Sequence, residues 1–103
     1  MTVVEKKNDF SQRISRDDLM KRTRQGWLIP GFISEAQFWL LVNASSMRSD
    51  KMVNALFEHL VKGVSRKESC TKHNVNSGHF SIGLGRLQQL SHIAAKLSYF
   101  YQC

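Results

Sequence analysis

Residues 63–90 read GVSRKESCTKHNVNSGHFSIGLGRLQQL, and this stretch decides the fold. Its segment SRKE, at residues 65–68, has the pattern of a helix-capping box in which Ser65 caps a short helix. We expect that helix to end near His73 and a second helix to begin at Ser77 after a three- or four-residue turn. Two helices joined in this way form a helix-turn-helix, which we place at about residues 64–90.

Four residues have the properties that two closely packed helices require. Cys70 is small enough to let the helices approach each other, and Asn74 can turn the chain because asparagine adopts positive φ readily. Val75 and Phe80 are apolar and follow the turn at the positions that would plug the core. We therefore predict that the packing residues of the motif are Cys70, Asn74, Val75 and Phe80.

Polar and cationic side chains are left on the outside of this unit. The N-terminus of the second helix offers unpaired N–H groups and a partial positive charge that suit phosphate. In a helix-turn-helix the first helix crosses the DNA backbone, so its cations flank the same surface. The predicted DNA contacts are Arg66, Lys67, Lys72, Asn76, Ser77, His79, Ser81 and Arg86. The alternatives are a structural hairpin in which Arg66 pairs with Glu68, and a dimer or solvent role for Arg86.

The rest of the chain also has helical patterns. Ser34 begins a second capping box and predicts a helix over residues 35–45, and Ser49 and Asp50 begin another that Gly63 would end. No stretch alternates apolar and polar residues as a strand would, so we predict an all-α fold with a long last helix. The inward stripe expected on that helix is Phe80, Leu84, Leu87, Leu90, Ile93, Ala94 and Leu97.

The length of 103 residues fits one domain. Residues 1–26 are charged and weakly patterned, with at most one helical stripe formed by Phe10, Ile14 and Leu19. We interpret them as a mobile or partner-ordered arm. The turn residues Pro30 and Gly31 then deliver the chain to the first firm helix. The predicted organisation is an arm at 1–26 and a single helical DNA-binding domain at 27–103.

The formal net charge is +7, and it is unevenly distributed. Residues 62–103 contain six Lys and Arg against one Asp or Glu, whereas residues 27–61 contain two against three. A basic segment that coincides with a helix-turn-helix favours double-stranded DNA as partner. The alternative is a basic face that only maintains solubility.

Other classes of protein fit the sequence poorly. Cys70 and Cys103 have no paired spacing and no secretory leader precedes them, so we expect a reducing cytoplasm. The histidines lack zinc-site spacing, no nucleophile and base group together, and no apolar run approaches the about 20 residues of a membrane span. The sequence therefore predicts no metal, no cofactor and no enzymatic activity. Cys70 could be a redox sensor or metal ligand with His73, but a buried packing role is favoured.

Two further features point to close packing and association. Gly83 and Gly85 lie inside the predicted last helix, where each costs about 1 kcal/mol relative to alanine. We interpret them as places where another helix approaches closely, either the helix of Phe57 or a second subunit. The aromatic run Tyr99, Phe100 and Tyr101 would leave apolar surface exposed unless another molecule covers it.

Several blocks of the sequence resemble a known family. The runs VSRKESC, NSGHFS and LGRLQQL, together with LIPGFISEAQFWLLVNASSMRSDKM upstream, are similar to the PapB-type regulators of bacterial fimbrial adhesin operons. The resemblance covers roughly Leu28 to Tyr101 and excludes residues 1–26. It implies a cytoplasmic, nucleoid-bound transcription regulator that binds AT-rich repeats as a homodimer or larger homo-oligomer, through the minor groove. Arg66 and Cys70 match the family's DNA-binding motif, as contact and packing support respectively.

Two rival functions stay open at this point. The chain could be a protein-interaction module that acts on another regulator or a recombinase through its helical hairpin and aromatic residues. It could also bind structured RNA, which competition between duplex DNA and RNA would distinguish.

Overall fold

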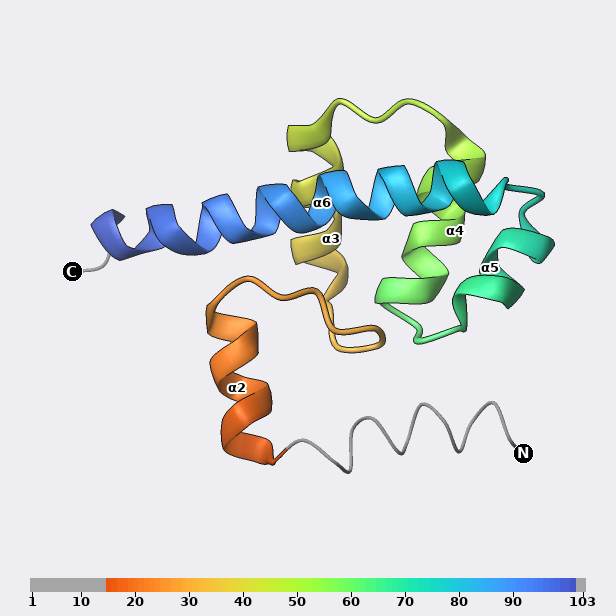
Figure 1. Ribbon diagram of the computed structural model, residues 1–103. Coiled ribbons are helices and arrows are strands. Elements are labelled where there is room, and N and C mark those ends of the chain that lie inside the picture. The colour runs from red at the N-terminus through yellow and green to blue at the C-terminus, as the bar shows by residue number, and fades with distance from the viewer. Residues whose placement is uncertain (1–14, 102–103) are drawn as a thin grey trace.

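The computed structural model describes residues 15–101, and every regular element in that range is helical (Figure 1). The prediction of an all-α fold is therefore confirmed. The elements are α2 (Arg16–Arg24), α3 (Glu35–Ser45), α4 (Asp50–Leu60), α5 (Arg66–Lys72), α6 (Ser77–Ser98) and the 3₁₀ turn η1 (Tyr99–Tyr101). The helices expected at residues 35–45, from Asp50, from Ser65 to His73 and from Ser77 are all present.

Side-chain caps fix where the helices begin. Ser15, Ser34, Ser49 and Ser65 each accept a hydrogen bond from the backbone N–H three residues later. Each hydroxyl satisfies one of the N–H groups that the first turn of a helix leaves without a partner. The predicted N-caps Ser34 and Ser65 are thus confirmed. The proposed C-cap is not: α4 ends at Leu60, and Gly63 has its positive φ of 78° in the connection that follows.

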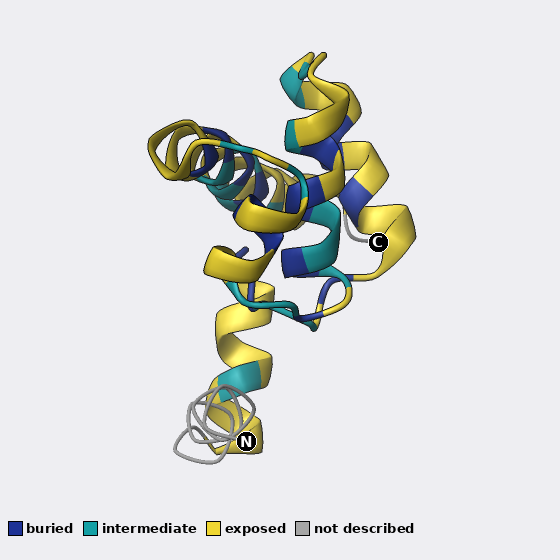
Figure 2. Ribbon diagram, turned by 90° about the vertical axis from the view of Figure 1, so that its right-hand side faces the viewer, coloured by how far each residue is buried: buried dark blue, intermediate teal, exposed yellow. Residues whose placement is uncertain are grey.

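The core forms where α6 crosses the other helices. Figure 1 shows α6 running across α3 and α4, with α5 beside its N-terminal end. The fully buried hydrophobic side chains come from three of these helices, and buried segments face inward in Figure 2. The largest are Phe38 of α3, Leu56 and Leu60 of α4, and Phe80 and Leu87 of α6.

The inward stripe predicted for the last helix is correct only over its first half. Phe80 and Leu87 are fully buried, and Leu84 and Leu90 pack against the core. Ile93 and Leu97, however, are about half exposed. The reason is that α3 and α4 cross α6 nearer its N-terminal end, so that its last turns project beyond the crossing (Figure 1).

The predicted N-terminal arm contains more structure than the sequence indicated. Ser15 caps α2, whose Arg16–Arg24 lie within the segment that we had interpreted as an arm without a firm helix. Regular structure thus begins well before residue 27 in the described chain. The remaining stripe residues Phe10 and Ile14 lie outside the described range, whereas Leu19 is partly buried on α2.

The two glycines of α6 have different surroundings. A Cβ on Gly83 would lie 3.1 Å from the Sδ of Met52 and 3.5 Å from Leu56, so α4 passes close to α6 at this point. The close approach to the helix of Phe57 is confirmed for Gly83. It is wrong within this chain for Gly85, because a Cβ there would meet no described atom within 4 Å.

We predict opposite effects of substitution at these two positions. Gly85→Ala should raise the free energy of unfolding by about 0.5–1 kcal/mol, because alanine has the higher helix propensity and the site has room. Gly83→Leu should lower it by about 1–3 kcal/mol, because the side chain would overpack the contact with Met52. Urea unfolding followed by circular dichroism measures both. Equal effects of the two changes would contradict the packing described above.

An ionic cluster joins α4 to α5. A carboxylate oxygen of Glu58 lies 2.9 Å from Nζ of Lys72 and 3.2 Å from Nε2 of His73. The hydrogen bond from Lys72 lowers the pKa of Glu58, and partial burial of the carboxyl group opposes this shift without cancelling it. Lys72 is therefore turned toward α4 and helps to hold α5 in place.

This cluster predicts a pH-dependent contribution to stability. Because the pKa of Glu58 is lower in the folded than in the unfolded state, its contribution is present above the ordinary value of 4.5 and is lost as pH falls through the folded pKa. Glu58→Gln should therefore destabilise the protein more at pH 7 than at pH 3.5. The same comparison in a Lys72→Ala background should show a smaller pH-dependent difference. A difference independent of pH would contradict the role of the charge.

Candidate nucleic-acid interface

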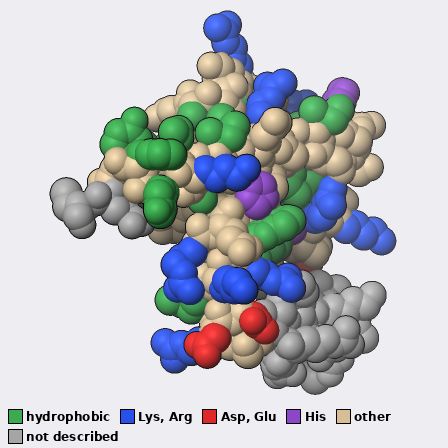
Figure 3. Space-filling view, turned by 60° about the vertical axis from the view of Figure 1, so that its left-hand side comes forward, with side chains coloured by type: hydrophobic (Ala, Val, Ile, Leu, Met, Phe, Trp, Pro, Cys, Tyr) green, Lys and Arg blue, Asp and Glu red, His purple; other side chains and the backbone are tan. Residues whose placement is uncertain are grey.

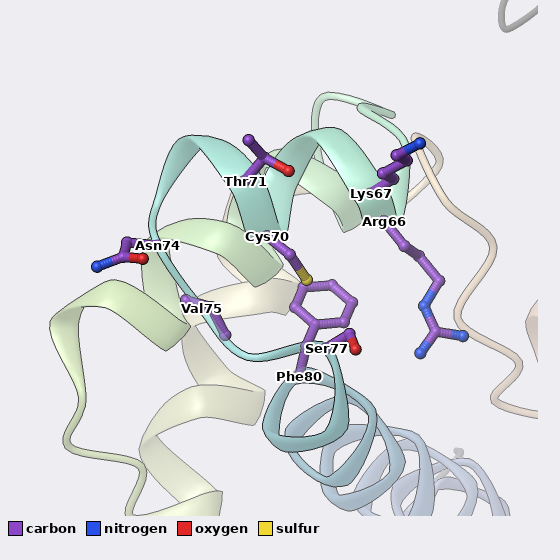
Figure 4. Close-up of a pocket in the computed structure, with 8 residues that line it drawn as sticks. All are labelled: Arg66, Lys67, Cys70, Thr71, Asn74, Val75, Ser77 and Phe80. Atoms are coloured by element: carbon purple, nitrogen blue, oxygen red, sulfur yellow. The ribbon is translucent and has the colours of Figure 1, made fainter.

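A tight turn sets α5 against the start of α6. Asn74 adopts a left-handed φ of 54°, and the N–H of Val75 donates to the carbonyl of Cys70 at 2.9 Å. Cys70 is buried, Phe80 is fully buried and Val75 is half-buried, whereas the side chain of Asn74 is exposed. Asn74 thus acts through its backbone conformation, and the other three side chains pack between the helices, as Figure 4 shows.

A notch lies between α5 and the first turns of α6, and Arg66 occupies its outer edge. Its side chain is exposed, and its guanidinium donates a hydrogen bond to the hydroxyl of Ser81. The guanidinium carbon also lies 5.5 Å from the centre of the Phe80 ring, within the range of a cation–π contact. These contacts hold one face of the guanidinium against α6 and leave the group accessible to a ligand.

The notch is a cleft of about 570 Å³ between α5 and the first turn of α6. Figure 4 shows Arg66 reaching down past the mouth of this cleft and Lys67 leaving the same helix in the opposite direction. Both cations thus belong to one end of the motif. The cleft is lined by Arg66, Lys67, Cys70, Thr71, Asn74, Val75, Ser77 and Phe80.

Asn76 has a structural role that the sequence interpretation overlooked. Its side-chain oxygen accepts hydrogen bonds from the N–H groups of Gly78 at 2.8 Å and His79 at 3.3 Å, and so it caps α6. Asparagine is among the strongest N-cap residues, which is the signal that could have identified this role. Only the amide NH₂ of Asn76 is left to donate to a ligand.

The remaining predicted contacts fall on the other flank of α6. His79 and Arg86 line a second cleft with Arg48 and Ile82, which the prediction did not include. Ser77 and Ser81, in contrast, lie on the flank beside Arg66. On a helix with 100° per residue, positions 81 and 86 are about 140° apart, so the predicted residues form two cationic edges rather than one patch. Lys72 pairs with Glu58 and lines a third cleft together with Lys67.

A strip of two glycines and one exposed isoleucine separates the two edges. Gly78, Ile82 and Gly85 follow the i, i+4, i+7 spacing of a single helix face, and all three are exposed. Ile82 is 66% exposed, which is unusual for a large apolar residue in the middle of a helix. Ile82 does not share the spacing of the predicted inward stripe of this helix, and this was the sequence signal for its outward position.

Metal sites and membrane-spanning helices are both absent from residues 15–101. No group of three or more potential metal ligands comes together there. No helix in that range is both long and apolar enough to cross a bilayer. Cys70 is a free thiol buried under the notch, consistent with its predicted packing role.

Comparison with known proteins extends the similarity beyond the motifs. The family model of the adhesin biosynthesis transcription regulatory protein PapB matches residues 9–101, so the resemblance begins before Leu28 and includes α2. The major pilus subunit operon regulatory protein PapB of Escherichia coli is 46% identical over 78 residues, covering 76% of this chain and 75% of its own length. The AFA-III adhesin operon regulatory protein of E. coli is 44% identical over 79 residues, covering 77% and 78% respectively.

A solved structure agrees with the fold. The crystal structure of E. coli FocB matches with a TM-score of 0.70 and 40% identity, over 85% of this chain and all of the FocB chain. The helical architecture of the described residues is thus shared with a solved structure. The protein belongs to the PapB family of adhesin biosynthesis transcription regulatory proteins, which are not enzymes.

Proposed function

We propose that this protein regulates transcription of a fimbrial adhesin operon by binding AT-rich double-stranded DNA through the notch between α5 and α6. The observation that carries the proposal is the exposed Arg66 guanidinium, held against Ser81 and the Phe80 ring at the edge of the notch. A guanidinium that is already oriented loses little side-chain entropy when it enters a groove. Such an activity would take place on the bacterial nucleoid.

The chemistry of α6 favours reading of DNA shape over reading of individual bases. Specific contacts in the major groove come mainly from long side chains with two polar atoms, such as Arg, Asn and Gln. The outward positions beside and between the two edges, 77, 78, 81, 82 and 85, instead carry Ser, Gly, Ser, Ile and Gly, whereas His79 and Arg86 lie on the far edge. A·T-rich minor grooves are narrow and electronegative and attract inserted arginine. We therefore assign Arg66 to the minor groove.

The other predicted contacts have supporting roles in this arrangement. Lys67 and Ser77 flank Arg66 at the cleft, and Arg86 and His79 form the opposite edge of α6. The glycines between the edges bring the helix backbone close to the duplex. We assign these groups to phosphates on either side of the groove, where contacts fix position without specifying sequence. Because Lys72 pairs with Glu58, we assign it first to holding α5 in place.

Association between copies would make such contacts effective. Tyr99, Phe100 and Tyr101 are each at least 75% exposed, and the half-exposed Ile93 and Leu97 lie on the same projecting end of α6. Figure 3 shows hydrophobic side chains gathered on one part of this surface. We propose that a second copy covers them, so that several weakly binding notches act together on repeated sites.

The DNA-binding role predicts a specific effect of changing Arg66. Arg66→Ala should reduce affinity for an AT-rich duplex about ten- to hundredfold, while leaving the fold intact because the side chain is exposed. Arg66→Lys should recover only part of the loss, because a lysine lacks the planar fork. The matched control is Lys51→Ala, which lies in the first turn of α4, whereas the last turn of α4 leads to α5. This variant should change affinity less than about twofold. Gel shifts with folded variants measure this, and unchanged binding by Arg66→Ala would refute the assignment.

The groove can be tested with the same assay. An inosine·cytosine duplex lacks the guanine amino group of the minor groove but keeps the major-groove pattern of G·C. If the minor groove is read, this duplex should bind nearly as well as A·T DNA. Binding as weak as that of G·C DNA would place the protein in the major groove instead.

The aromatic end of α6 gives a separate prediction. Tyr99→Ser together with Phe100→Ser should lower the mass seen in sedimentation and abolish the steep concentration dependence of binding to repeated sites. Affinity for one isolated site should stay within about twofold. Phe32→Ser, at an exposed aromatic outside this surface, serves as control. If the double variant still assembles but no longer forms a salt-resistant complex with another protein, the rival function of a protein-interaction module is favoured.

A further inference from the structure

The helix α2 is short, charged and exposed. It has nine residues, none of them buried, and Figure 2 shows it exposed along almost its whole length. An isolated helix of this length is marginal in water, because helices below about 12–15 residues do not offset the cost of nucleation. Packing within the described chain therefore provides little of the stability of α2 and leaves most of its surface open to a partner.

The charge of α2 indicates what kind of partner that is. Lys21, Arg22 and Arg24 lie in its last turn, whereas its first turn holds Arg16 together with Asp17 and Asp18, so the positive charge is concentrated at the C-terminal end. Among the described residues, the ion pairs are those of Glu58, so these four cations have no described carboxylate within 4.0 Å. Figure 3 shows Lys and Arg side chains gathered on the lower part of the surface, with two acidic side chains beside them. An anionic surface would complement this end of α2.

The connection after α2 is firmly held against α6. The side chain of Gln88 accepts from the N–H of Leu28 at 3.0 Å and donates to the carbonyl of Gly26 at 2.8 Å. His92 contributes two more contacts, with Nδ1 2.8 Å from the carbonyl of Gln25 and its ring 4.7 Å from that of Trp27. The placement of α2 relative to α6 is therefore fixed by specific hydrogen bonds.

The contacts of Gln88 and His92 with residues 25–28 form a clamp, and Gly26 provides the space that these contacts need. Its φ is 93°, and a Cβ at this position would lie 2.6 Å from the carbonyl oxygen of Ser91 and 2.8 Å from Cα of His92. Both are backbone atoms that cannot move aside. A side chain at residue 26 would therefore separate the connection from α6 without altering any charge on α2.

The spacing along α6 relates α2 to the notch. Ser77 stands at the notch and His92 at the clamp, and fifteen residues of helix rise about 22 Å. At about 3.4 Å per base pair, this corresponds to six or seven base pairs. Figure 1 shows α2 and α5 near different parts of α6. The two cationic elements are thus separated by a distance that one duplex can span.

We propose that α2 is a second DNA-contacting element, which binds backbone phosphates of the same duplex about six or seven base pairs away from the site occupied by Arg66. This inference rests on the proposed DNA-binding function. The cations of α2 are contacts with phosphate, which carry affinity and position but no sequence information. The clamp of Gln88 and His92 sets the distance between the two contacts.

The experiment measures how binding of the full chain to an AT-rich duplex depends on salt. Arg22→Gln with Arg24→Gln should lower the magnitude of the negative slope of log affinity against log salt by about two, since each phosphate contact contributes about 0.9. The footprint should shorten by about six base pairs on one side only. The matched control is Lys51→Gln with Lys62→Gln, which removes the same charge from α4 and its end and should leave footprint and slope nearly unchanged.

A second variant tests the clamp without removing charge. Gly26→Ala should shorten the footprint on the same side and lower the slope, although every cation of α2 is kept. If the α2 double variant lowers the slope no more than the control and keeps the full footprint, the proposal is overturned. It is also overturned if the slope is unchanged but assembly is lost, since α2 would then face another copy. Failure of the unmodified protein to bind DNA would instead refute the proposed function itself.

Discussion

The burial of Phe80 is the constraint on which the rest of the structure depends. Its side chain is fully enclosed where α4, α5 and α6 meet, with the His59 ring 5.6 Å away on one side and the Arg66 guanidinium over it on another. Because this ring follows the turn at Asn74 by six residues, its burial fixes how far α6 lies from α5. The same contact that completes the core thus also sets the position of the exposed cation.

Structural and functional demands coincide at this notch. Serine at position 81 and glycines at 78 and 85 keep the outer side of α6 low, while its inner side meets α4 at Gly83. A helix with so little side chain on opposite faces depends on a few strong contacts, namely the Asn76 cap and the apolar side chains of Phe80 and Leu87. Small side chains allow this surface to come close to a ligand, but the glycines lower the intrinsic helix propensity of α6.

The local signals in the sequence were sufficient for most of the fold. Capping serines, the turn at Asn74 and the spacing of Phe80 and Leu87 are short-range patterns, and the structure has each of them. Long-range relations were less accessible. Nothing in the spacing of Lys72 shows that it meets Glu58, and nothing near Arg86 shows that it lies on the opposite edge from Arg66. The helix α2 was missed because it lacks the apolar periodicity on which helix prediction depends.

The hydrogen bonds of Gln88 fix one of two attachment points on α6, so the helix between these points sets the distance that separates them. The amide of Gln88 holds Leu28 and Gly26 at one level of the helix, while the notch occupies another level that is set by Phe80. Each residue inserted or removed between these levels would turn one end by 100° relative to the other and shift it by 1.5 Å. Relatives that preserve both attachments can therefore change this interval only by steps close to whole helical turns, so the length of the segment should be inherited more strictly than its composition.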